Sequence, residues 1–147
     1  MIFTLIFWAS VILLAHSYLL YPIIIQLIAQ NRSLSKNIFK INESLPFVSI
    51  VLSAHNEEKV IAEKIKSILH TSYPLNKIEL IIGSDNSEDS TNRICEIYEK
   101  NYENILFLPF QKRRGKPAVI NELIAKSRGS IIIITDANVF FKHDTIF

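Results

Sequence analysis

The first 30 residues of the chain carry no charged side chain, and this feature constrains the fold most. All 30 charged residues, 16 Lys or Arg and 14 Asp or Glu, lie from Arg32 onward. A helix needs about 20 apolar residues to cross the hydrocarbon core of a bilayer, and residues 2–30 exceed that length. The sequence therefore predicts a transmembrane anchor over residues 1–30, with a helix kink at Pro22.

The residues that follow this apolar segment predict its orientation. Arg32, Lys36 and Lys40 come directly after it, and the first acid is Glu43. Because Lys and Arg stay on the cytoplasmic side, we expect a single pass through the cell inner (plasma) membrane, with the C-terminal domain in the cytoplasm. Residues 31–45 are then a basic juxtamembrane linker. A cleaved signal peptide is the alternative, but it would begin with basic residues and have an apolar core of only ~7–15 residues.

The composition of the remaining chain is that of one globular domain, and it excludes several classes of protein. A single Cys excludes a disulfide framework within the chain and a Cys-based zinc site. A net charge of +2 gives no sign of a nucleic-acid partner. We therefore expect no nucleic-acid partner, and the apolar N-terminal segment makes the lipid bilayer an expected partner.

From residue 46 onward, short apolar runs alternate with helical patterns. The runs predict four strands, at residues 47–53, 78–83, 105–108 and 131–135. Helices are expected to open at residues 56–58 and to span residues 91–100 and 117–127. This alternation predicts an α/β domain over residues 46–147, with a doubly wound, mostly parallel sheet.

Polar residues follow each predicted strand. In a parallel sheet these positions meet at one edge, where ligands bind. They are residues 54–57, 84–87, 112–116 and 136–138, and they include carboxylates, cations and amides. This mixture suits an anionic ligand with a polar ring, such as a nucleotide. The chain has no GxGxxG after a strand and no GxxxxGK[ST], so a dinucleotide fingerprint and a P-loop are both excluded.

Four segments resemble, in order and spacing, the motifs of the family 2 glycosyltransferases. Residues 48–58 resemble the family's strand ending in P-x-Y-N-E, and residues 81–91 its V-x-D-x-S-x-D-x-T loop. Residues 113–121 resemble its R-x-G-K-x-x-A-L-N segment, and residues 132–138 its strand ending in D-x-D. The likeness is to the membrane-bound bacterial branch, which includes cellulose-synthase-like and poly-N-acetylglucosamine-synthase-like enzymes.

The resemblance implies the nucleotide-diphospho-sugar transferase fold and a UDP-sugar donor. Asp85 would accept a hydrogen bond from uracil, and residues 54–57 would line the uridine. Asp136 and Asn138 would face ribose, diphosphate and a divalent metal, Mg²⁺ or Mn²⁺, whose charge neutralises the leaving diphosphate. The implied donor-binding residues are Ala54, His55, Asn56, Glu57, Asp85, Arg114, Lys116 and Asp136.

The chain departs from the family pattern in three ways. His55 replaces the usual Tyr and Ser53 the usual Pro, so the surface under the base differs. Asn138 stands where a second Asp is common, and an amide oxygen brings no charge to a metal. The chain also stops at Phe147, before the family's acceptor-binding elements and catalytic base. We therefore expect the donor-binding half of an inverting glycosyltransferase, inactive alone, whose acceptor is a saccharide or is linked to lipid.

Several alternatives stay open from the sequence alone. Asp85 could instead cap a turn, and residues 112–116 could be a solvated loop, in which Lys112 and Arg113 are expected to be solvated. The whole chain could be a non-catalytic, membrane-anchored nucleotide-sugar-binding or scaffold fragment. A sugar-nucleotidyltransferase is a weaker third reading, because the turn after the first strand has no Gly.

Overall fold

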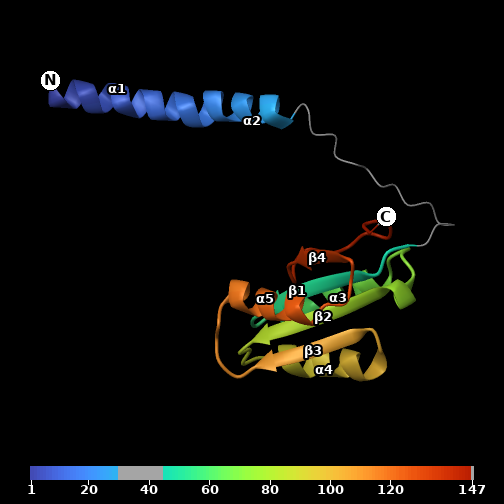
Figure 1. The fold of residues 1–147 in the computed structure, drawn as a ribbon. Coiled ribbons are helices and arrows are strands. Elements are labelled where there is room, and N and C mark those ends of the chain that lie inside the picture. Colours follow the sequence, from blue (N-terminus) through green and yellow to red (C-terminus); the bar gives the residue numbers. More distant parts are fainter. Residues whose placement is uncertain (30–44, 147) are drawn as a thin grey trace. The chain divides into compact units, whose positions relative to one another are not determined.

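The computed structural model describes residues 1–29 and 45–146, which belong to two units (Figure 1). The expected linker, residues 31–45, lies outside the described residues except for Leu45, which is buried. The N-terminal unit is helical from Ile2 to Ala29 and the second unit is an α/β domain. The domain boundaries expected after residues 30 and 45 stay predictions.

The N-terminal unit consists of α1 (Ile2–Ala15), a π-helical segment (His16–Leu20) and α2 (Tyr21–Ala29). The helix of 28 residues has a mean hydropathy of 2.0 and none of its residues is buried, so it is long and apolar enough to cross a membrane. The π-helical segment lies just before Pro22, which lacks the N–H that a regular helix would use.

The α/β domain is built on a four-stranded parallel sheet. Its strands are β1 (Val48–Ala54), β2 (Ile78–Asp85), β3 (Ile105–Phe110) and β4 (Ile131–Thr135). The order across the sheet is β3-β2-β1-β4, and every neighbouring pair is parallel. The predicted parallel α/β sheet is therefore confirmed, with each predicted strand present.

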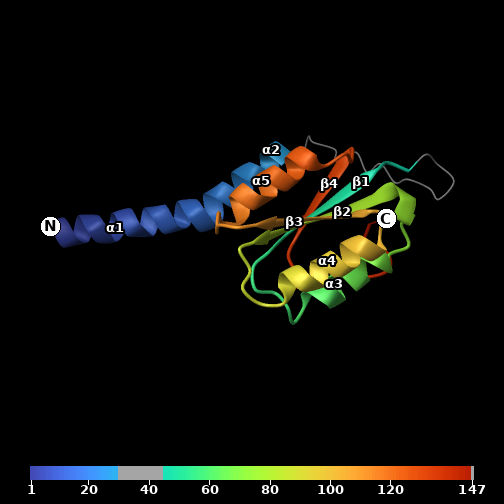
Figure 2. The same cartoon turned by 90° about the horizontal axis from the view of Figure 1, so that it is seen from below.

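Helices cover both faces of this sheet. Figure 2 shows α3 (Ile61–Leu69) and α4 (Thr91–Asn101) on one face and α5 (Lys116–Lys126) on the other. The chain moves outward from β1 through β2 to β3, then crosses over by α5 and returns to β4 on the other side of β1. The strand order thus reverses between β1 and β4, which is the switch point where sheets of this type bind ligands.

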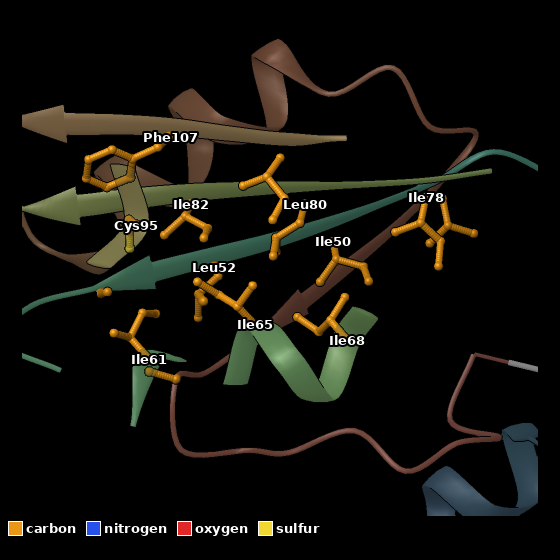
Figure 3. Packing of buried hydrophobic residues seen from close by; sticks show 14 of the residues in the cluster. Ile50, Leu52, Ile61, Ile65, Ile68, Ile78, Leu80, Ile82, Cys95 and Phe107 are labelled. Atoms are coloured by element: carbon orange, nitrogen blue, oxygen red, sulfur yellow. The ribbon is translucent and has the colours of Figure 1, made fainter. Parts of the chain in front are cut away.

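Alternating side chains of the strands divide the core into two layers. Ile50 and Leu52 of β1 pack with α3 on one face, together with Ile65 (Figure 3). Val51 of β1 packs on the opposite face, against α5. Gly83 of β2 lets α5 approach closely, because a Cβ there would lie 2.6 Å from Cγ1 of Val119. The packing fixes where each strand ends, and hence where the polar loops begin.

The first helix of the domain begins later than the sequence predicts. We expected it to open at residues 56–58, but α3 starts at Ile61. Asn56 has a φ of 55°, and its side-chain oxygen accepts from the N–H of Glu88, in the loop after β2. A bond between two loops has therefore replaced the expected helix cap.

At the amino ends of the strands, opposite the polar loops, the chain is held together by the buried carboxylate of Glu79. Its Oε1 accepts from Oγ of Ser49 at 2.5 Å and from the backbone N–H of Arg128 at 2.6 Å, while Nε of Arg128 donates to Oε2 at 2.8 Å. Burial alone would raise the pKa of Glu79, but these bonds together lower it. The turn before β4 is thereby tied to β1 and β2.

Candidate functional site

A hollow of about 310 Å³ lies where β1, β2 and β4 end, at the switch point of the sheet. Its walls come from the ends of these three strands and from the loop before α5. The lining residues are Ser53, Ala54, His55, Glu57, Asp85, Arg113, Gly115, Lys116, Asp136, Ala137 and Asn138. Segments up to 85 residues apart in the sequence meet here, as the strand-end rule predicted.

Asp85, the last residue of β2, is the most enclosed carboxylate of the hollow. Only 4% of its surface is exposed. Its Oδ1 accepts from the N–H of Arg114 at 2.7 Å, and its Oδ2 accepts from the N–H of Gly115 at 2.8 Å. Asp85 therefore holds the basic loop in place, and each oxygen keeps a further lone pair for another donor. Gly115 has a φ of 83°, a conformation that glycine adopts without strain.

His55 follows β1 and is oriented by the same strand end. Its Nδ1 lies 2.8 Å from the backbone carbonyl oxygen of Asp85. Because a carbonyl oxygen only accepts, Nδ1 carries the proton and donates. This leaves Nε2 as the ring nitrogen available to a ligand in the hollow.

The loops after β1 and β2 are joined by several hydrogen bonds. The N–H of Glu57 donates to Oγ1 of Thr91 at 2.8 Å, and the N–H of Ser90 donates to Oε2 of Glu58 at 3.0 Å. Asn56 belongs to this network and is absent from the lining of the hollow. The side of the hollow next to β1 and β2 is therefore held in shape by hydrogen bonds within the protein.

The basic residues before and within α5 have different positions. Lys116 lines the hollow and its Nζ donates to Oδ1 of Asp136. The Arg114 side chain turns instead toward Glu122 of α5, with which it forms an ion pair, and its guanidinium lies 5.0 Å from the ring centre of Phe110. Arg113, expected to be solvated, is exposed and also lines the hollow.

Asp136 and Asn138 provide the oxygen atoms that a divalent metal would use. Both follow β4 and line the hollow, on a turn that the N–H of Val139 closes onto the carbonyl of Asp136 at 3.2 Å. Among the described residues, no group of three or more His, Cys, Asp or Glu side chains forms a metal cage. One carboxylate and one amide nevertheless fit Mg²⁺ or Mn²⁺, which bind few protein ligands and take the rest from phosphates and water.

Lys64 is not among the site residues predicted from the sequence. Its side chain contacts the residues on either side of this turn. It lies in the middle of α3 and is fully buried. Its Nζ donates to Oγ1 of Thr135 at 2.8 Å and to the carbonyl of Val139. Burial lowers the pKa of Lys64 to about 8, against the opposing attraction of Asp136. Lys64 lies three residues after Ile61 and four before Ile68, so helical spacing places it on the buried face of α3, a local signal that could have identified it.

The arrangement can bind a flat polar ring and an anion side by side. The β1 and β2 side offers Asp85 and His55 as hydrogen-bonding groups. The β4 and α5 side offers the cation of Lys116 and the two oxygen ligands, Asp136 and Asn138. Positive charge next to hard oxygen ligands is the chemistry that a phosphorylated ligand with a divalent metal requires.

Comparison with known proteins agrees with this chemistry. The family model "Glycosyl transferase family 2" matches residues 49–146. A probable glycosyltransferase, YdaM, of Bacillus subtilis is 34% identical over 99 residues, covering 65% of this chain and 24% of that protein. A β-monoglucosyldiacylglycerol synthase of Nostoc is 36% identical over 109 residues, covering 73% of this chain and 23% of that protein. The chain thus spans about a quarter of the length of these relatives.

Solved structures share the fold at lower identity. A mannosyltransferase of Pyrobaculum calidifontis, PcManGT, in complex with GDP-Man and Mn²⁺, superposes with a TM-score of 0.66 at 23% identity. That match covers 90% of this chain and 39% of the mannosyltransferase. Residues 1–349 of S. aureus TarS, in complex with UDP, give a TM-score of 0.63 at 23% identity, covering 67% of this chain and 29% of TarS. The resemblance drawn from the four sequence motifs is confirmed: the chain belongs to glycosyl transferase family 2.

Proposed function

We propose that this chain is the donor-binding part of a glycosyltransferase that takes its sugar from a UDP-sugar. One observation carries the proposal: a single hollow at the switch point gathers Asp85, Lys116 and Asp136 from three separate strand ends and loops. Structural neighbours support a nucleotide-sugar donor, since their solved complexes contain GDP-Man and UDP.

The base would lie on the side of the hollow formed by β1 and β2. Each oxygen of Asp85 already accepts one loop N–H and keeps one lone pair for a further in-plane donor. Uracil presents a single ring N–H, whereas guanine presents two adjacent donors. His55 Nε2, together with Ala54 and Glu57, would complete the surroundings of the uridine. Because each oxygen of Asp85 can accept one further donor, Asp85 suits either base, and the choice of UDP rests on the resemblance to UDP-sugar enzymes.

The diphosphate would lie between α5 and the turn after β4. Asp136 and Asn138 would hold a divalent metal, Mg²⁺ or Mn²⁺, which when bound neutralises the negative charge of the leaving diphosphate. Lys116, whose ammonium pairs with Asp136 in this structure, is close enough to contact a phosphate oxygen instead. Arg113 adds a second cation to the lining of the hollow.

The reaction we infer is an inverting transfer at the membrane. An acceptor hydroxyl attacks the anomeric carbon, the bond to the diphosphate oxygen breaks, and the hydroxyl proton passes to a base on a further part of the enzyme. We infer that the acceptor is a saccharide or a lipid-linked group. The apolar helix and the cations after it, at Arg32, Lys36 and Lys40, support one membrane pass within this chain, with its α/β domain on the cytoplasmic face of the inner membrane.

Calorimetry on the 147-residue chain in detergent micelles tests the donor site. We expect UDP to bind more tightly than GDP, and Mn²⁺ to strengthen UDP binding at least tenfold over EDTA. Asp136→Ala should abolish the gain from Mn²⁺, while Asp144→Ala, an exposed acid outside the lining of the hollow, should keep it. Absence of UDP binding with and without Mn²⁺ would contradict the proposal.

A further inference from the structure

A fully buried ammonium group lies beneath the candidate metal site without touching the candidate ligands. Lys64 of α3 is 0% exposed and is not part of the lining of the hollow. Its Nζ donates to Oγ1 of Thr135 and to the carbonyl of Val139, and it lies 4.2 Å from the ring centre of Phe141. The three directions of the ammonium thus meet a hydroxyl, a carbonyl and an aromatic face.

These contacts lie on both sides of the turn that presents the oxygen ligands. Thr135 is the last residue of β4 and directly precedes Asp136, while Val139 directly follows Asn138. A third bond from α3 extends the hold, because the N–H of Phe141 donates to Oγ of Ser67 at 3.1 Å. Helix α3 therefore contacts the chain both before and after the ligand-bearing turn.

Packing alone does not account for a lysine at this position. Placing an ammonium where no carboxylate contacts it is costly, and an apolar residue of similar length would fill the space at lower cost. The lowered pKa of Lys64, about 8, reflects this desolvation. We therefore expect the Lys64 ammonium to make an interaction that an apolar side chain could not make.

Apart from Ala137, which packs into the core, and the bond from the N–H of Val139 to the carbonyl of Asp136, the turn has little support of its own. It follows an edge strand, and Asp136, Asn138 and Val139 are all exposed. Divalent metals of the Mg²⁺ type demand near-ideal geometry, and groups behind the ligands commonly supply it. The hydrogen bonds from Lys64 to Thr135 and Val139 hold the chain on both sides of the turn and would supply that geometry.

We propose that Lys64 is the positioning residue of the turn formed by Asp136, Ala137 and Asn138. Its buried ammonium ties Thr135 and Val139 together and so sets the geometry at which Asp136 and Asn138 meet a metal-bound diphosphate. The proposal rests on the proposed function for the metal, but its structural part, the fixing of the turn, is independent of any ligand.

Binding measurements on three variants of the 147-residue chain in micelles test the role toward the metal. Thr135→Val removes the hydroxyl that Lys64 reaches, Thr135→Ser keeps it, and Lys64→Met removes the ammonium. We expect Lys64→Met to weaken UDP binding in Mn²⁺ at least tenfold and Thr135→Val about threefold, while Thr135→Ser binds like the parent chain. UDP binding in EDTA should change less than twofold in all three, since the base side of the hollow is untouched.

A ligand-independent measurement makes the test decisive. Amide hydrogen exchange followed by mass spectrometry should show faster exchange of residues 136–141 in Lys64→Met, with residues 49–53 unchanged. Ile68→Val, which trims a buried side chain of the same helix, should leave both segments unchanged. Unchanged exchange of residues 136–141, or equal losses of UDP binding with and without Mn²⁺, would overturn the proposal. If the parent chain bound no UDP at all, the proposed function would be wrong and the exchange result alone would decide the role of Lys64.

Discussion

Because the Lys64 ammonium is buried, we expect the free energy of unfolding of the α/β domain to rise with pH above about 8. The pKa of Lys64 is about 8 in the folded domain, against 10.5 for the ordinary side chain, because burial disfavours its charged form. Between these two values the unfolded chain binds more protons than the folded one, so the free energy of unfolding rises with pH. A difference of 2.5 pKa units corresponds to about 3 kcal/mol.

The measurement compares the parent chain with Lys64→Met by pulse proteolysis in urea, from pH 7 to pH 10.5, in EDTA. Subtracting the two cancels the other groups that titrate in this range. The free energy of unfolding of the parent, relative to Lys64→Met, should be lowest and constant below pH 8 and should then rise by about 3 kcal/mol toward pH 10.5.

Lys66→Met is the matched control, because it removes the same charge from an exposed position two residues along the same helix. It should show no such rise relative to the parent. A difference between the parent and Lys64→Met that stays flat, within about 0.5 kcal/mol, would refute the reasoning that Lys64 is desolvated beneath the turn.

Three further substitutions or treatments test other parts of the structure. Asp85→Asn places an amide N–H against the loop N–H groups, so the free energy of unfolding should fall by about 1.5–3 kcal/mol and UDP affinity should fall with it; parent-like stability in urea would show that Asp85 does not hold the loop. Gly129→Ala should cost about 1–3 kcal/mol by overpacking, because its Cβ would lie 2.5 Å from the backbone nitrogen of Ser49; an unchanged urea midpoint would count against that close approach. Burial, with smaller contributions from nearby acids, raises the pKa of the Cys95 thiol to about 12, so the thiol should react with a disulfide reagent at pH 8 only after unfolding, and rapid labelling of the folded chain would disprove its burial.

Much of the sheet and of the site's location could be predicted from local patterns. The apolar runs gave all four strands, and the strand-end rule brought Asp85, Lys116 and Asp136 to one hollow. These predictions succeed because strand periodicity and the geometry of parallel sheets depend on neighbouring residues and on topology alone.

The features that the sequence did not predict depend on distant partners. Asn56 looked like a helix cap, but its side chain bonds to Glu88, 32 residues further on. Lys64 falls on the apolar stripe of α3, but its hydrogen-bond partner Thr135 lies 71 residues away and could not be inferred from that stripe. The run of isoleucines at residues 131–134 predicts a strand but not its exposure: Ile134 is 55% exposed, and β4 is an edge strand among the described residues.

Photo-crosslinking with 5-azido-UDP in Mn²⁺ tests the central claim, that this hollow is the nucleotide site, most directly. The account predicts that the label falls on residues 53–57 or 84–88 of the 147-residue chain, that unlabelled UDP competes it away, and that Asp85→Asn reduces it. Competable labelling confined to other segments of the chain, or labelling that unlabelled UDP does not reduce, would contradict the account.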